Sequence, residues 1–101
     1  MRIRIKKTPP GLAPEWVRAA WVGIEMESTG KEDPKTLTDY DLLIGRREGK
    51  ENLGGYKVYG EVAFKALQPV NQKAYDWWMK NRPRISHCEL IFHTDVCEEI
   101  S

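Results

Sequence analysis

The clearest hydrophobic pattern in the chain lies between Pro69 and Pro83 and predicts an amphipathic helix over about 71–82. At about 100° per residue, apolar side chains gather on one helical face and charged ones on the other. The first face carries Val70, Ala74, Trp77, Trp78 and Asn81, and the second carries Gln72, Lys73, Asp76 and Lys80. Asn71 is expected to cap the first turn, and Pro83 to end the helix. This helix should therefore dock its tryptophan face on the rest of the domain.

The segment before this helix fits two patterns. Apolar residues alternate from Tyr56 to Ala66, as in one long strand, but positions 62, 63, 66 and 67 also form a helical stripe. Gly60 is a natural break between the two patterns. We expect a strand up to Tyr59 and a shorter helix over about 61–68, with a continuous strand as the alternative.

Alternation of apolar and polar residues predicts several short strands. Ile3 and Ile5 share one face near the N-terminus, and the basic residues on the other face suggest an edge strand. Further strands are expected over 20–27, 40–45 and 88–93. The chain should end in a turn that is capped by Thr94 or Asp95 and carries Val96 and Ile100. A helical turn is expected over 14–18.

These elements predict a small α+β fold. We expect a mostly antiparallel, curled sheet or partly open barrel of about five strands. It should pack on the main helix over about 71–82 and on the shorter preceding helix over about 61–68. A chain of 101 residues has room for one core, so we expect a single domain over 1–101.

Composition narrows the function classes without selecting one. Hydrophobic residues make up 41% and charged residues 31% of the chain, which is typical of an ordinary globular domain. Sixteen basic and fifteen acidic residues give a net charge of +1, whereas a strong binder of the phosphate backbone normally has a clear basic excess. Charge therefore indicates no particular partner.

The two cysteines and the N-terminus suggest a reducing compartment. Met1–Lys7 contains basic residues, but no apolar stretch typical of a signal peptide follows them. No run approaches the about 18 apolar residues of a membrane span. We therefore expect a cytoplasmic protein with two free thiols and no membrane contact.

Four soft ligands near the C-terminus raise the question of metal binding or catalysis. His87, Cys88, His93 and Cys97 lie within eleven residues. Their spacing contains no CxxC or HxxxH pair, and a strand over 88–93 would point Cys88 and His93 to opposite faces. A thiolate dyad of His93 and Cys97 would be surrounded by carboxylates, which raise a thiol pKa. The chain also lacks a phosphate-binding loop. From the ligand spacing, the surrounding carboxylates and the missing loop together, we expect no metal, no cofactor and no enzymatic activity.

The adjacent tryptophans of the main helix carry the first functional hypothesis. Trp77 and Trp78 lie about 100° apart, so one helical face can hardly bury both. We expect Trp77 in the core and Trp78 at the surface, where it would form a patch with Tyr75 and Met79. Tryptophan is enriched at the centres of protein interfaces. The sequence therefore predicts a non-catalytic binding or adaptor domain that recognises a protein partner, or a second copy of itself.

A basic and aromatic sheet edge carries the alternative hypothesis. Arg46 and Arg47 precede a predicted strand that contains Tyr56, Lys57 and Tyr59. Aromatic side chains between basic ones can stack bases while the cations follow the phosphates. The alternative function is single-stranded nucleic-acid binding.

Overall fold

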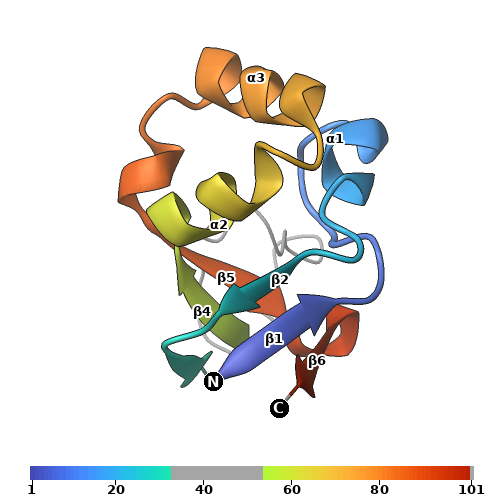
Figure 1. Ribbon diagram of the computed structural model, residues 1–101, viewed down its shortest axis with the longest axis vertical. Helices are drawn as coiled ribbons and strands as arrows, with labels where there is room; N and C mark the ends of the chain where they lie inside the picture. The colour runs from blue at the N-terminus through green and yellow to red at the C-terminus, as the bar shows by residue number, and fades with distance from the viewer. Residues whose placement is uncertain (33–53, 101) are drawn as a thin grey trace.

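Two antiparallel sheets and three α-helices make up the part of the chain that this computed structural model describes, residues 1–32 and 54–100. The strands are β1 (Arg2–Ile5), β2 (Glu25–Glu27), β3 (Gly30–Glu32), β4 (Gly55–Tyr59), β5 (Glu89–His93) and β6 (Cys97–Ile100). The helices are α1 (Glu15–Ala19), α2 (Gly60–Leu67) and α3 (Gln72–Asn81), with 3-10 turns η2 (Ile85–His87) and η3 (Thr94–Val96). In Figure 1, α2 lies between α3 and the strands.

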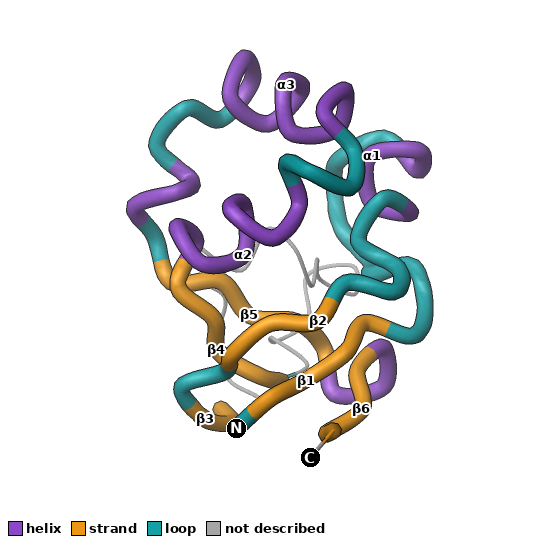
Figure 2. The backbone as a smooth tube through the Cα atoms, viewed as in Figure 1, coloured by secondary structure: helices purple, strands orange, loops and turns teal. Residues whose placement is uncertain are grey.

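The predicted α+β class and the antiparallel pairing are confirmed. The strands form two sheets of three, in the orders β2-β1-β6 and β3-β4-β5, and these sheets do not close into a barrel. Figure 2 shows the strands gathered at one end of the molecule and the helices at the other. The expected strand over 40–45 lies outside the described residues.

The first strand has the expected alternation but not the expected place. Ile3 and Ile5 are fully buried. The edge position is wrong, because β1 is the central strand of its sheet and pairs with both β2 and β6. Arg4 lies 3.0 Å from Glu25 on one neighbour and 2.9 Å from Glu98 on the other. The basic row thus serves cross-strand charge pairing rather than protection of a free edge.

The strand predicted over 20–27 begins only at Glu25. Residues 20–23 form a turn, in which Gly23 adopts a φ of +89° that favours glycine. Trp21 and Ile24 are both buried, and Val22 is exposed. Because this turn breaks the period of two, Trp21 and Ile24 are buried together and the strand is shorter than predicted.

A short polar cluster ties the two sheets together. The Tyr56 hydroxyl on β4 donates to the Glu99 carboxylate on β6 at 3.1 Å. Lys31 on β3 lies 3.7 Å from the same carboxylate, and its ammonium lies 5.1 Å from the centre of the Tyr56 ring. Burial and the bond to Glu99 raise the pKa of the Tyr56 phenol. Tyr56 therefore links its own sheet, through Glu99, to the sheet that contains β6.

The ambiguous segment before the main helix is helical, as expected. The buried side of α2 carries Ala63, Phe64 and Leu67. Gly60, its first residue, lets η2 approach, since a Cβ there would collide with the Ile85 carbonyl oxygen.

The predicted C-terminal turn is present, but its cap and its extent were predicted wrongly. The 3-10 turn η3 ends at Val96, and the side chain that accepts at its start is His93, from the Asp95 N–H at 3.3 Å. The chain then continues as β6, which pairs with β1. Pairing with a strand almost a hundred residues earlier is a non-local contact, which the local capping pattern could not reveal.

The core is built around edge-to-face aromatic contacts. The ring of Trp21 lies 5.4 Å from that of Phe64 and 5.2 Å from that of Phe92. Phe64 continues the cluster to Trp78, at 5.8 Å. This chain of rings connects the sheets, α2 and α3.

Candidate functional site

Helix α3 forms one wall of the candidate site, and it has the predicted cap. The Asn71 side chain accepts a hydrogen bond from the Ala74 N–H at 3.0 Å. At the other end, the Arg82 N–H donates to the Trp78 carbonyl at 2.7 Å, just before Pro83. The helix is thereby fixed at both ends.

The two tryptophans of α3 are placed opposite to the prediction. Trp78 is only 2% exposed, whereas Trp77 is half-buried and stands nearly perpendicular to it, with ring centres 5.1 Å apart. The physical reason is the rotation of the helix. Trp78 and Tyr75 both place their rings against Phe64 of α2, at 5.8 Å and 6.3 Å, so the side of α3 that carries Trp78 faces the core.

The predicted patch of Tyr75, Trp78 and Met79 is therefore not an exposed surface. Tyr75 and Met79 are half-buried and pack against the core. Trp78 belongs to the core itself. That any of these three residues contacts a partner remains a prediction. Of the two tryptophans of α3, Trp77 is the more accessible.

The second wall is the proline-rich loop before α1. From α1, Arg18 donates to the Ala13 carbonyl at 2.8 Å and to the Pro9 carbonyl at 3.1 Å. Ala13 is buried, but Leu12 is 78% exposed. Prolines restrict the backbone, and the two bonds from Arg18 hold it in place. The loop thus presents an apolar side chain to solvent on a fixed backbone.

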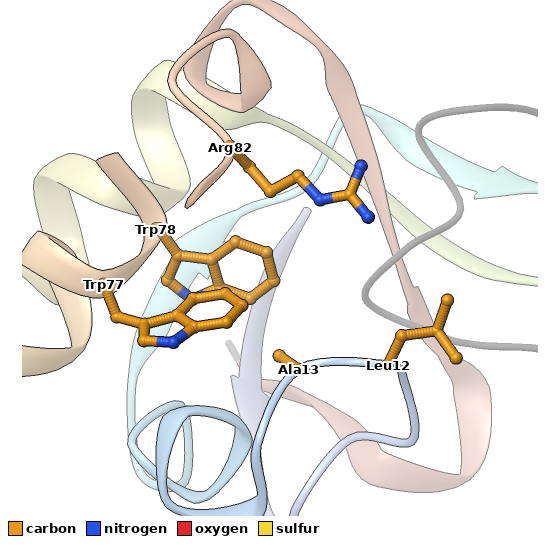
Figure 3. Close-up of a pocket in the computed structure, with 5 residues that line it drawn as sticks. All are labelled: Leu12, Ala13, Trp77, Trp78 and Arg82. Carbon is orange, nitrogen blue, oxygen red and sulfur yellow. The ribbon is translucent and has the colours of Figure 1, made fainter. Parts of the chain in front are cut away.

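A small hollow lies where the loop meets the helix. It is lined by Leu12, Ala13, Trp77, Trp78 and Arg82 (Figure 3). Its volume of about 40 Å³ corresponds to about three water-sized groups. Small-molecule sites usually measure about 300–1,000 Å³. The hollow thus suits a single side chain better than a cofactor.

We call Leu12, Trp77 and Arg82, which line the hollow, the recognition surface. Trp16 on the neighbouring α1 is 52% exposed, but it does not line the hollow. Within the described part of the chain, the Arg82 side chain forms no ion pair or hydrogen bond. Apolar side chains beside an unpaired guanidinium are typical of protein interfaces.

The sequence did not identify Leu12 as a functional residue, and it did not predict that Trp16 would be exposed. A leucine in a proline-rich loop and a tryptophan in a short helix are both compatible with burial. Their exposure depends on how α1 and its loop pack against α3. The only local signal was the high aromatic content of the chain.

The predicted nucleic-acid site is brought together only in part. Tyr56 is 4% exposed and uses its hydroxyl for Glu99, so its ring is not available to stack on a base. Lys57 is half-buried, and Tyr59 is exposed. Arg46 and Arg47 lie outside the described residues.

The thiols and histidines show no arrangement for metal binding or nucleophilic attack. Over 1–32 and 54–100, no group of three His, Cys, Asp or Glu side chains could hold a metal ion. Burial raises the pKa of the Cys97 thiol to about 12, despite an opposing effect of Lys6. A thiol with such a pKa is protonated at neutral pH and is a poor nucleophile.

Comparison with known proteins identifies no relative. No family model, curated protein or solved structure matches this chain. Among the described residues, no helix has the length and apolar character needed to span a membrane.

Proposed function

We propose that this protein is a non-catalytic recognition domain that binds another protein through the recognition surface. One observation carries the proposal: the exposed Leu12 and the half-buried Trp77 border a hollow of about 40 Å³. A partner would place one apolar side chain in this hollow, against the rings of Trp77 and Trp78. Recognition by a central anchor in a small pocket is the usual arrangement of binding hot spots.

The rigidity of the surface supports this proposal. Binding is weakened when flexible loops and side chains must become ordered. Arg18 already holds the loop that carries Leu12, and the Trp77 ring packs edge-to-face against the buried Trp78. Much of the ordering has therefore occurred before a partner arrives. Tryptophan and arginine, which this surface combines, are the residues most enriched among hot spots.

A random peptide library displayed on phage tests the proposal. Immobilised wild-type protein should enrich peptides that share an apolar anchor residue, and Leu12→Asp should not retain these peptides. Val62→Asp is the matched control, because Val62 is also an exposed aliphatic residue but lies outside the hollow. The proposal fails if no sequence is enriched, or if Leu12→Asp retains the enriched peptides as well as wild type does.

Single-stranded nucleic-acid binding has less support, because the buried Tyr56 leaves Tyr59 as the exposed aromatic residue of β4. We also propose that the protein acts in the cytoplasm. Both Cys88 and Cys97 are free, which suits a reducing compartment.

A further inference from the structure

We infer that the partner at the recognition surface is a second copy of this chain, bound in a two-fold symmetric dimer. The inference rests on the proposed function and names its partner. In such a dimer the same patch meets itself. If one residue of the first copy contacts a second residue of its partner, the reverse contact forms as well. The patch must therefore carry both a projecting side chain and a hollow that receives it. It must also carry charges of both signs, so that opposite charges meet across the interface.

The recognition surface carries both shapes. Leu12 is the most exposed large hydrophobic residue in the described part of the chain, and it lines a hollow of about 40 Å³. Two copies related by a two-fold axis near this rim would each place Leu12 in the hollow of the other. Each Leu12 would then contact the tryptophan rings of its partner. The projecting side chain and the hollow that receives it thus belong to the same surface.

The charges are also self-complementary. Glu15 begins α1, three residues after Leu12, and Arg82 follows α3 on the other side of the hollow. Both side chains are exposed, and neither forms an ion pair within 1–32 and 54–100. Seating Leu12 in the partner's hollow brings Glu15 of one copy toward Arg82 of the other. Because of the two-fold symmetry, this pair of opposite charges occurs twice in the dimer.

The size of the chain bounds the expected strength. Specific interfaces cover about a tenth of the surface of a small protein. A tenth of the 5956 Å² of accessible surface of this chain would be about 600 Å² per copy. A total of about 1,200 Å² lies at the lower limit for specific interfaces and is typical of weak, transient contacts. The dimer should therefore dissociate on dilution.

Sedimentation equilibrium tests the inference over protein concentrations from about 1 μM to about 1 mM, which spans the affinities of weak complexes. Wild type should rise from a mass of 11.7 kDa toward twice that value. Leu12→Asp should stay monomeric throughout, and Val62→Asp should follow wild type. Circular dichroism of each variant verifies that it is folded.

Charge reversal separates a specific contact from general stickiness. Glu15→Arg and Arg82→Glu should each weaken the dimer by at least tenfold, because each places like charges in both symmetric contacts. The double variant restores opposite charges and should recover most of the lost affinity. A role of either residue in folding alone would not produce this recovery.

The inference is overturned if wild type stays monomeric at the highest concentration, if Leu12→Asp still dimerises, or if the double variant does not recover. The peptide selection distinguishes the two proposals. A monomeric protein that still enriches Leu12-dependent peptides recognises a different protein, and only the dimer is wrong. A monomeric protein that enriches no peptide contradicts both.

Discussion

Replacing each tryptophan of α3 by alanine tests the reversed placement of these two side chains. A buried tryptophan removes about 150–250 Å² from water, which at about 25 cal/mol per Å² gives about 4–6 kcal/mol. The Trp78 indole N–H is buried without a hydrogen-bond partner in the described structure, which offsets about 1–3 kcal/mol of this gain. We therefore expect Trp78→Ala to lower the free energy of unfolding by about 3 kcal/mol. Trp77→Ala, which removes a half-buried ring, should cost only about 1 kcal/mol.

Urea denaturation followed by far-ultraviolet circular dichroism measures both effects without relying on tryptophan fluorescence. With a slope of about 1.5 kcal/mol per molar urea, Trp78→Ala should lower the midpoint by about 2 M, and Trp77→Ala by less than 1 M. Dilute protein should be used, so that self-association does not add to stability. If Trp77→Ala proves as destabilising as Trp78→Ala, the rotation assigned to α3 is wrong.

Four further predictions concern the rest of the fold. Gly60→Ala should lower the melting temperature markedly and cost about 1–3 kcal/mol, because its Cβ would collide with the Ile85 carbonyl oxygen; an unchanged melting temperature would contradict the close approach. Asn71→Ala should cost about 1 kcal/mol in urea denaturation, whereas Asn71→Asp should keep most of the cap; equal losses would exclude the capping role. Cys97 should resist a thiol reagent in the native protein and react in urea, and rapid native labelling would contradict its burial. Folding raises the pKa of the Cys97 thiol from 9.0 to about 12, so the unfolded chain releases this proton at lower pH than the folded protein. The contribution of Cys97 to the free energy of unfolding should therefore fall as pH rises from about 9 to about 12. Cys97→Ala removes this part of the pH dependence.

Local signals explain what could be predicted from the sequence. The bounds and cap of α3 follow from Asn71 and the flanking prolines, which act within one turn of the backbone. The alternation of β1 follows from the pleat of a strand, and the break at Gly60 from its lack of a side chain. Each of these features depends on residues that are close together in the chain.

Non-local contacts explain what could not be predicted. The rotation of α3, and with it the choice between Trp77 and Trp78, depends on Phe64 in another helix. The central place of β1 depends on its pairing with β2 and β6, which come from two distant segments. No periodicity within one segment contains this information.

The recognition surface was missed for the same reason. The sequence indicated that α3 holds one aromatic residue too many for its buried face, and this remains the origin of the binding hypothesis. Which residues surround the half-buried ring of Trp77 depends on α1 and its loop. The two hydrogen bonds from Arg18 hold the loop that carries Leu12, and this loop lies beside Trp77 of α3 at the hollow.

Nuclear magnetic resonance of isotope-labelled protein, titrated with an enriched peptide, tests the central claim most directly. The account predicts that the shifts concentrate on the indole N–H of Trp77 and on the backbone amides of Leu12, Ala13 and Arg82. Shifts that concentrate on Tyr59 and the rest of β4, or that leave Trp77 and Leu12 unchanged, would contradict it.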